Sequence, residues 1–160
     1  MAKSFREKLA EIKPDLPSVQ TIEPGMAKKW GQGTIVMPTM QEVDALMKKV
    51  PKGKLLTINQ MREYLADKHG ATISCPIVTG IFARIAAGAA GEWLDEGRKR
   101  VTPYWRTLKG KGEINPKYPG GLDGQRERLE AEGHSVEARG KKMYVLDFER
   151  KLIKVENLRV

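Results

Sequence analysis

Apolar residues recur at spacings of three and four positions in several stretches of the chain, which is typical of helices with one buried face. Met40, Val43, Leu46 and Met47 are a clear example. The pattern predicts helices over residues 5–12, 40–49, 58–68, 74–87 and 122–131. Three of these helices follow a capping box, in which Ser or Thr precedes Glu or Gln by three positions: Ser4 with Glu7, Thr39 with Glu42, and Thr57 with Gln60.

Strand signals are fewer and short. Residues 34–36 are β-branched and predict one short strand. Apolar and polar residues alternate over 135–138 and 143–146, on either side of the basic segment 139–142. This arrangement predicts a β-hairpin with a basic tip.

Prolines 14, 17 and 24 interrupt the pattern near the N-terminus, so we expect residues 14–33 to form an extended arm without regular structure. Residues 151–160 show no clear pattern. The sequence therefore predicts a mainly α fold with a small β component (α+β). Its expected organisation is an N-terminal arm over residues 1–40 and one domain over residues 41–160.

Two of the expected helices form a pair with a brief turn between them. The first covers residues 57–68, and the second covers 74–87, with Ser74 as its expected N-cap and Pro76 in its first turn. With the hairpin that follows, this is the order of a winged helix-turn-helix, whose second helix enters a DNA groove. An ordinary helical hairpin has the same periodicity, so both interpretations stay open at this point.

Composition narrows the class of protein. The chain has 160 residues, of which 40% are apolar, enough for one core and too many for a disordered chain. The longest uncharged apolar run, residues 70–83, is shorter than the roughly 20 residues that span a bilayer. Residues 1–8 are charged and lack the apolar stretch of a secretory leader. We therefore expect a cytoplasmic protein that does not contact a membrane.

Cysteine and histidine are scarce. The chain has one Cys and two His, which excludes an internal disulfide and disfavours a Cys- or His-based metal centre. We expect neither a metal nor another cofactor. Cys75 lies near the start of an expected helix, where a thiolate is favoured, although a lone Cys is more often a small buried residue.

The excess of basic residues in the chain indicates an acidic binding partner. Lys and Arg number 29 against 20 Asp and Glu, for a net charge of +9 and a pI of about 9.7. Residues 97–119 carry seven basic residues and one acidic residue, a local charge of +6. Tyr104, Trp105 and Tyr118 lie in the same segment. Basic and aromatic residues in a loop favour nucleic-acid binding, and a solvated loop with scattered charge is the alternative.

Four ordered segments resemble the C-terminal DNA-binding domain of O6-alkylguanine-DNA alkyltransferases. They are VPKGKLLT at 50–57, TPYWRTL at 102–108, NPKYPGGL at 115–122 and LEAEGH at 129–134. The second lines up with the family's active-site segment Pro-Cys-His-Arg-Val, and the third with the loop that closes over a flipped base. The resemblance covers about residues 42–136 and implies a winged helix-turn-helix that binds double-stranded DNA.

The catalytic positions differ from those of the family. Tyr104 stands at the position of the alkyl-accepting cysteine and Trp105 at that of the neighbouring histidine, while Glu132 is retained. A phenol titrates near pH 10 and is a poor nucleophile for alkyl transfer. The chain thus resembles the cysteine-less alkyltransferase-like proteins, which bind alkylated DNA without repairing it and pass the lesion to a repair pathway. We expect no enzymatic activity, and a repair protein is an expected further partner.

The resemblance also implies a base pocket. Its expected residues are Tyr104, Trp105, Tyr118, Gly120, Gly121 and Glu132. Tyr104 and Trp105 have two interpretations: they form a stacking surface for an extruded base, or they fill the former pocket and close it.

A second set of residues is expected to contact DNA. It consists of Lys52, Lys54, Thr57, Ile77, Arg84, Arg106, Lys109 and Lys111. Ile77 lies near the position of the arginine that fills the gap left by a flipped base, and is either an apolar wedge or a core residue. Arg84 is either a phosphate contact or a solvated side chain. The alternative functions are alkyl transfer or other chemistry through Cys75, and a winged-helix module for protein or RNA.

Overall fold

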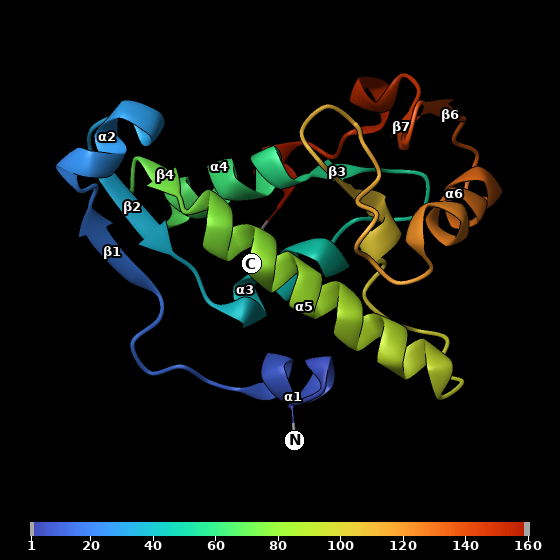
Figure 1. Cartoon of the computed structure of the whole chain (residues 1–160), viewed down its shortest axis with the longest axis horizontal. Helices are drawn as coiled ribbons and strands as arrows, with labels where there is room; N and C mark the ends of the chain where they lie inside the picture. Colours follow the sequence, from blue (N-terminus) through green and yellow to red (C-terminus); the bar gives the residue numbers. More distant parts are fainter. Residues whose placement is uncertain (1, 159–160) are drawn as a thin grey trace.

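The longest helix, α5 (Pro76–Asp95), runs through the middle of the molecule, and the other elements pack around it (Figure 1). The computed structural model describes residues 2–158 and has an α+β architecture. The other helices are α1 (Phe5–Ala10), α2 (Pro24–Trp30), α3 (Met40–Lys48), α4 (Ile58–His69) and α6 (Gly121–Ala131). Short 3-10 helices are η1 (Tyr104–Arg106), η2 (Phe148–Lys151) and η3 (Val155–Asn157).

The strands form three small sheets. They are β1 (Ser18–Thr21), β2 (Thr34–Met37), β3 (Leu56–Thr57), β4 (Ile73–Ser74), β5 (Thr107–Leu108), β6 (Val136–Arg139) and β7 (Lys142–Val145). β2 pairs antiparallel with β1 and parallel with β4, β3 pairs parallel with β5, and β6 and β7 form the predicted hairpin. The small-β component is therefore confirmed.

The three predicted capping boxes are present. The hydroxyls of Ser4, Thr39 and Thr57 each accept a hydrogen bond from the backbone N–H three residues later. Gly70 ends α4 in the left-handed conformation (φ +66°), which costs glycine little. Local sequence signals thus set these helix boundaries.

Helix α5 differs from its prediction at both ends. Its N-cap is Cys75 rather than Ser74, whose hydroxyl instead lies 2.9 Å from the hydroxyl of Thr79. The helix continues past residue 87 to Asp95, because the Ala- and Gly-rich stretch 86–91 is buried in the core. Gly88 and Gly91 allow close packing: a Cβ at either position would overlap Phe5 or Pro119, respectively.

The length of α5 bears on the membrane expectation. By length and composition it is the one helix, among the described residues, that passes as a membrane span. Nine of its residues, between Thr79 and Gly91, are buried inside the protein. Phe82, Ala83, Ala86, Ala87 and Ala90 of this helix belong to the main core cluster of the fold.

The expectation of an irregular segment at residues 14–33 is wrong. β1 and α2 form there, and β1 pairs with β2 over its whole length. Pro24 does not interrupt structure, because it occupies the first turn of α2, where a missing N–H leaves no bond unmade. Ile22 and Ile35 form a second small cluster with Cys75, which ties this segment to the start of α5.

Candidate functional site

Three aromatic rings gather where the family resemblance places the active-site segment. Tyr104 and Trp105 lie in η1 and are 2% and 8% exposed. Their rings meet edge to face, with centroids 5.2 Å apart. Tyr118 approaches Tyr104 in the same way from the loop before α6, at 6.2 Å. The arrangement fits the geometry that aromatic pairs prefer and makes the cluster part of the core.

Glu132, at the end of α6, joins this cluster through its carboxylate. Trp105 Nε1 donates to Glu132 Oε2 at 3.1 Å, and Arg106 donates to both carboxylate oxygens at 2.9 and 2.7 Å. Burial alone would raise the pKa of Glu132, but the hydrogen bonds from Arg106 and Trp105 outweigh it and hold the pKa below its ordinary value. Glu132 is therefore an ionised acceptor that fixes two neighbouring side chains.

A hollow of about 520 Å³ opens beside the aromatic cluster, between the C-terminal end of α5, the loop before α6, and α6 itself. Its lining is Gly91, Leu94, Asp95, Tyr104, Pro119, Gly120, Gly124, Glu127, Arg128 and Ala131. Of the six expected pocket residues, Tyr104 and Gly120 line it. Trp105, Tyr118, Gly121 and Glu132 do not line it.

Arg128 separates Trp105 from this hollow. Its guanidinium carbon lies 4.5 Å from the centroid of the Trp105 ring, and Arg106 lies over the same ring at 5.5 Å. These are cation–π contacts. Because Trp105 is 8% exposed and outside the lining of the hollow, its ring is not available there for a base to stack on. The two residues therefore differ in position: Tyr104 forms part of the wall of the hollow, whereas Trp105 is a buried packing residue.

The phenol groups are poor candidates for chemistry. Burial raises the pKa of Tyr104, and a nearby Arg128 only partly offsets that effect. Burial also raises the pKa of Tyr118. Both phenols are therefore neutral at physiological pH, and a neutral phenol is a weak nucleophile.

Several of the expected DNA contacts cluster at one end of the β3–β5 pair. Leu56 lies opposite Thr107 and Thr57 opposite Leu108, so the loop after β5 runs beside the start of α4. Gly110 packs so closely there that a Cβ would lie 2.5 Å from the amide nitrogen of Asn59. Lys109 and Lys111 flank this glycine and are exposed.

Lys52 and Lys54 are also exposed, but they lie at the opposite end of β3. They belong to a tight turn that is closed by a 3.0 Å hydrogen bond from Lys54 N to the carbonyl of Pro51.

Arg106 is not in this outward-facing set. Its guanidinium is bound by Glu132 and by the carbonyl of Val50 at 2.7 Å, and its side chain is only 14% exposed. We therefore assign Arg106 an internal role rather than the expected phosphate contact, because Nε, Nη1 and Nη2 each donate within the protein and the side chain is largely buried.

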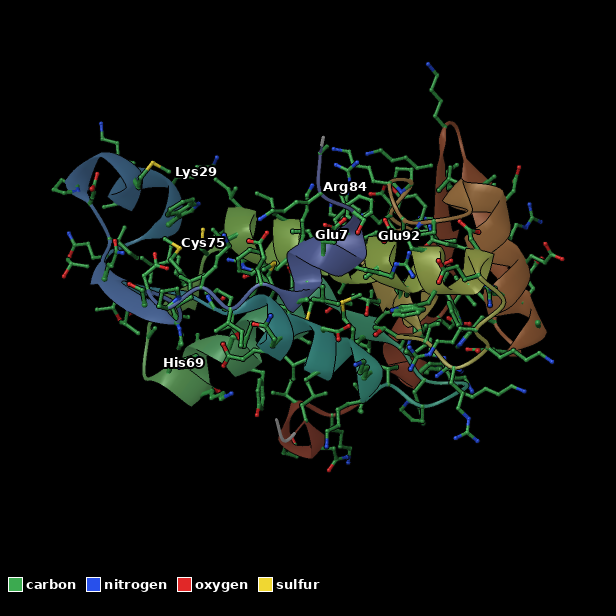
Figure 2. All side chains as sticks on the ribbon, turned by 90° about the horizontal axis from the view of Figure 1, so that it is seen from below. Glu7, Lys29, His69, Cys75, Arg84 and Glu92 are labelled. Atoms are coloured by element: carbon green, nitrogen blue, oxygen red, sulfur yellow. The ribbon has the colours of Figure 1, made fainter. Side chains whose placement is uncertain are left out.

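The exposed side of α5 carries the remaining candidates. Ile77 is 56% exposed and Ile81 is 51% exposed, so a core role for Ile77 is excluded. Arg84 is exposed on the same helix, near its middle (Figure 2). Positions 77, 81 and 84 follow the spacing of one helix face. Their exposed positions are compatible with Ile77 as an apolar wedge and with Arg84 as a phosphate contact.

Cys75 lies away from the hollow. It is 3% exposed and packs in the second small cluster, beside α2 at the start of α5 (Figure 2). A buried thiol among apolar side chains is inaccessible to a DNA base. Within residues 2–158, no group of three or more His, Cys, Asp or Glu side chains is arranged to hold a metal ion.

Comparison with known proteins gives two structural matches. No protein-family model and no curated protein matches the chain. One similar structure is S. pombe Atl1 in complex with damaged DNA containing O6-carboxymethylguanine, at 16% identity and a TM-score of 0.47. Another is S. pombe ATL in complex with DNA, at 20% identity and a TM-score of 0.48. Each match covers 72% of this chain and 94% of the other chain.

Sequence reasoning missed part of the site. Arg128 lies two turns into α6 in a segment that resembles any charged helix, and Asp95 lies beyond the predicted end of α5. The signal for Asp95 was the uninterrupted run of Ala and Gly after residue 85, which permits a long, closely packed helix. No local pattern indicates that Arg128 covers Trp105, because that contact depends on how α6 packs on η1.

Proposed function

We propose that the chain is a non-catalytic DNA-binding protein of the alkyltransferase-like class, which takes an extruded, alkylated base into the hollow beside Tyr104. The observation that carries the proposal is the parallel pairing of β3 with β5. It brings exposed Lys109 and Lys111 beside the first turn of α4. A cationic loop next to a helix start is a favourable place for DNA phosphates.

The first turn of α4 supports the phosphate contact. The capping box uses the Thr57 hydroxyl and the Gln60 side chain, which close the helix start within the protein. The N–H groups of Ile58 and Asn59, at the first two helical positions, have no intrahelical acceptor in such a turn. With Lys109 and Lys111 they form a donor-rich edge.

The hollow supports the contact with a base. Its volume of about 520 Å³ lies within the range of roughly 300–1,000 Å³ common for ligand pockets. Tyr104 provides an aromatic surface and a neutral hydroxyl, and Arg128 provides hydrogen-bond donors. These groups suit the recognition of a flipped base, whose extrusion costs less when it is damaged.

The residues around the hollow support a non-catalytic role. Tyr104 is neutral and buried where the related enzymes have their cysteine, and Cys75 is buried outside the lining of the hollow. Trp105 donates to Glu132 and has no basic nitrogen that accepts a proton. An alkyl group in the hollow therefore meets no activated nucleophile.

Fluorescence anisotropy tests the proposal with two duplexes that differ by one O6-methylguanine. We expect tighter binding to the modified duplex, and affinity for both to fall by a decade or more between about 50 and 200 mM salt. The double variant K109Q/K111Q should reduce the slope of log affinity against log salt by about 2. K13Q, an exposed change in the segment between α1 and β1, is the control.

Two results would contradict this function. One is DNA binding whose affinity does not depend on salt concentration, which would show that the protein does not contact the DNA phosphates. The other is equal affinity for the modified and unmodified duplexes, which would show that the protein binds DNA without recognising the alkylated base. Intact-mass measurement after incubation with the modified duplex should show no gain of a methyl group, and a gain would establish an enzyme.

A further inference from the structure

A second hollow lies on another side of α5, under the N-terminal helix. Its volume is about 280 Å³, and it is formed by α1, α3, the C-terminal half of α5 and residues 98–103. The residues that matter for its chemistry are three alanines, three cations and one carboxylate. They are Ala86, Ala89 and Ala90, then Lys48, Arg98 and Arg100, and Asp44.

The inner part of the hollow is apolar. Ala86, Ala89 and Ala90 lie on α5 and are at most 3% exposed, so their small side chains form a closed floor. Leu9 and Val101 add apolar surface at the sides. The volume corresponds to about nine water molecules at roughly 30 Å³ each, which suits the body of a small organic molecule.

The outer part is cationic. Arg98 and Arg100 are exposed, and neither has a carboxylate within 4.0 Å among residues 2–158. The single carboxylate, Asp44, is already satisfied: Thr102 donates to it at 2.7 Å, and the Lys48 ammonium lies 3.1 Å away. Within the described residues, no carboxylate therefore balances the positive charge of Arg98 and Arg100 at the rim of the hollow.

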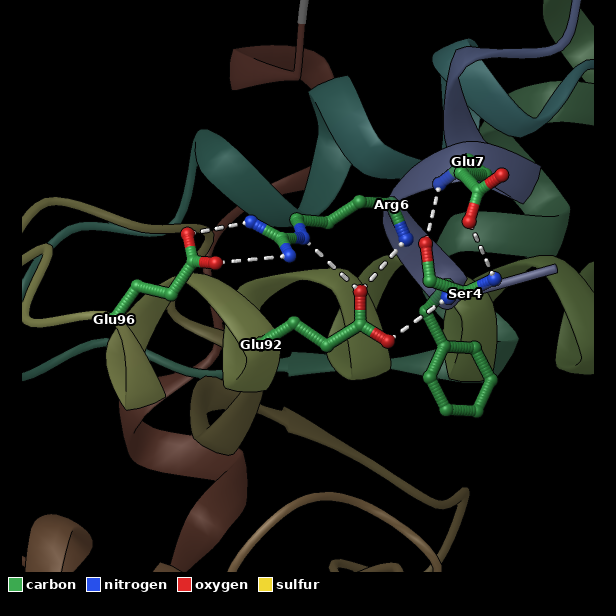
Figure 3. A network of polar contacts seen from close by, with 6 residues as sticks. Ser4, Arg6, Glu7, Glu92 and Glu96 are labelled. Atoms are coloured by element: carbon green, nitrogen blue, oxygen red, sulfur yellow. Dashed lines mark hydrogen bonds and ion pairs between the residues drawn. The ribbon is translucent and has the colours of Figure 1, made fainter.

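The wall formed by α1 is held in place by a polar network (Figure 3). Glu92 accepts hydrogen bonds from the backbone N–H groups of Phe5 and Arg6, both at 3.0 Å, and Glu96 accepts two more from the Arg6 side chain at 2.6 and 3.1 Å. Arg6 also lies over the ring of Trp93 at 4.6 Å, and Arg98 lies over the same ring at 4.8 Å. The hollow is thus largely preformed, which reduces the entropy cost of binding.

We propose that this hollow binds a small organic anion, with its apolar body on the alanine floor and a carboxylate or phosphate group at Arg98 and Arg100. The site is distinct from the proposed DNA surface. The basic segment 97–119 is divided between them, since Arg98 and Arg100 lie beside α1 and α3 while Lys109 and Lys111 lie beside α4. Guanidinium groups bind both kinds of anion well because their paired N–H donors match two oxygens.

Nuclear magnetic resonance titration of the full-length protein tests the site. The probes are phenyl phosphate, benzoate, the neutral isostere benzamide, and inorganic phosphate. We expect saturable shifts of the Ala86, Ala89 and Ala90 methyl signals with at least one of the two aromatic anions. Benzamide and inorganic phosphate should each bind about tenfold more weakly or worse, because each lacks one half of the recognised chemistry. The tighter of the two aromatic anions identifies the preferred acidic group.

Variants separate the site from general charge attraction. R100Q should weaken binding of the preferred probe by about tenfold, while K141Q, an exposed change elsewhere, should leave it unchanged. R98Q provides a second test at the same rim, and circular dichroism confirms that each variant is folded. The proposal is overturned if neither aromatic anion gives saturable shifts, if benzamide or inorganic phosphate binds as tightly, or if K141Q weakens binding as much as R100Q. DNA binding by R100Q should persist, so failure here leaves the proposed function standing.

Discussion

The indole N–H of Trp105 donates to the carboxylate of Glu132 at 3.1 Å, so the two residues keep a hydrogen bond where the family resemblance places a histidine and a glutamate. The Trp105–Glu132 bond has a different role from a histidine–glutamate bond. Histidine accepts a proton on one nitrogen while it donates from the other, whereas indole only donates. The contact is therefore structural, and it anchors η1 to the end of α6 together with Arg106.

Removing the charge of Glu132 should destabilise the fold. E132Q would leave the guanidinium of Arg106 largely buried without its ionic partner, since the side chains are 14% and 9% exposed. Loss of one partner from a buried pair costs about 3 kcal/mol of unfolding free energy. Urea unfolding at pH 7 measures the difference. E130Q changes an exposed pair with Arg126 and should cost less than about 0.5 kcal/mol; equal effects of the two changes would refute a buried role.

The contribution of Glu132 should also depend on pH. Its pKa is lower in the folded protein than in the unfolded chain, despite the burial that opposes this shift, because Arg106 and Trp105 bind the ionised form. Its stabilisation is therefore complete above the unfolded pKa of about 4.3 and is lost as the pH falls through the lower folded value. We expect the stability gap between wild type and E132Q to shrink in acid. Unfolding series from about pH 7 to pH 3 measure it, and a constant gap would contradict this linkage.

The local parts of the fold were predictable from sequence, and the reason is physical. Capping boxes at Ser4, Thr39 and Thr57 depend on contacts within four residues, so a short pattern specifies them. The segment 14–33 was mispredicted because its structure depends on partners far along the chain: β1 requires β2, and β2 in turn pairs with β4. Proline frequency marks where structure is interrupted, but it does not exclude a strand between two prolines.

The candidate site was predictable to a smaller extent. Two of the expected pocket residues, Tyr104 and Gly120, line a hollow, and their role in binding a base stays a prediction. Net charge did not identify which cations face outward. Arg106 has the same local sequence signal as Lys109, yet its donors bind Glu132 and Val50, and only the packing of α6 and the chain near residue 50 decides this.

The glycines of α5 provide a matched test of packing. G88A should destabilise the protein by about 1–3 kcal/mol, because the new methyl group overlaps the ring of Phe5 and forces α1 to shift. G80A places a methyl group with no atom within 4 Å other than the nearby backbone of its own helix and its chain neighbours, so its main effect is the better helix propensity of alanine. We expect it to stabilise by up to about 1 kcal/mol. Thermal and urea unfolding measure both variants, and stabilisation by G88A would show that α1 does not pack closely on α5.

The exposed face of α5 should matter for DNA binding and not for stability. Ile77 is 56% exposed, so I77A removes little buried surface and should change the unfolding free energy by less than about 0.5 kcal/mol. If Ile77 enters the gap left by an extruded base, I77A should weaken binding to the modified duplex about tenfold, because an apolar wedge replaces the lost base stacking. Binding to unmodified duplex should change much less. I12A removes an even more exposed isoleucine outside α5 and is the matched control. Anisotropy titrations with both duplexes decide the outcome: equal losses on the two duplexes would make Ile77 a general contact, and no loss would exclude Ile77 as an apolar wedge.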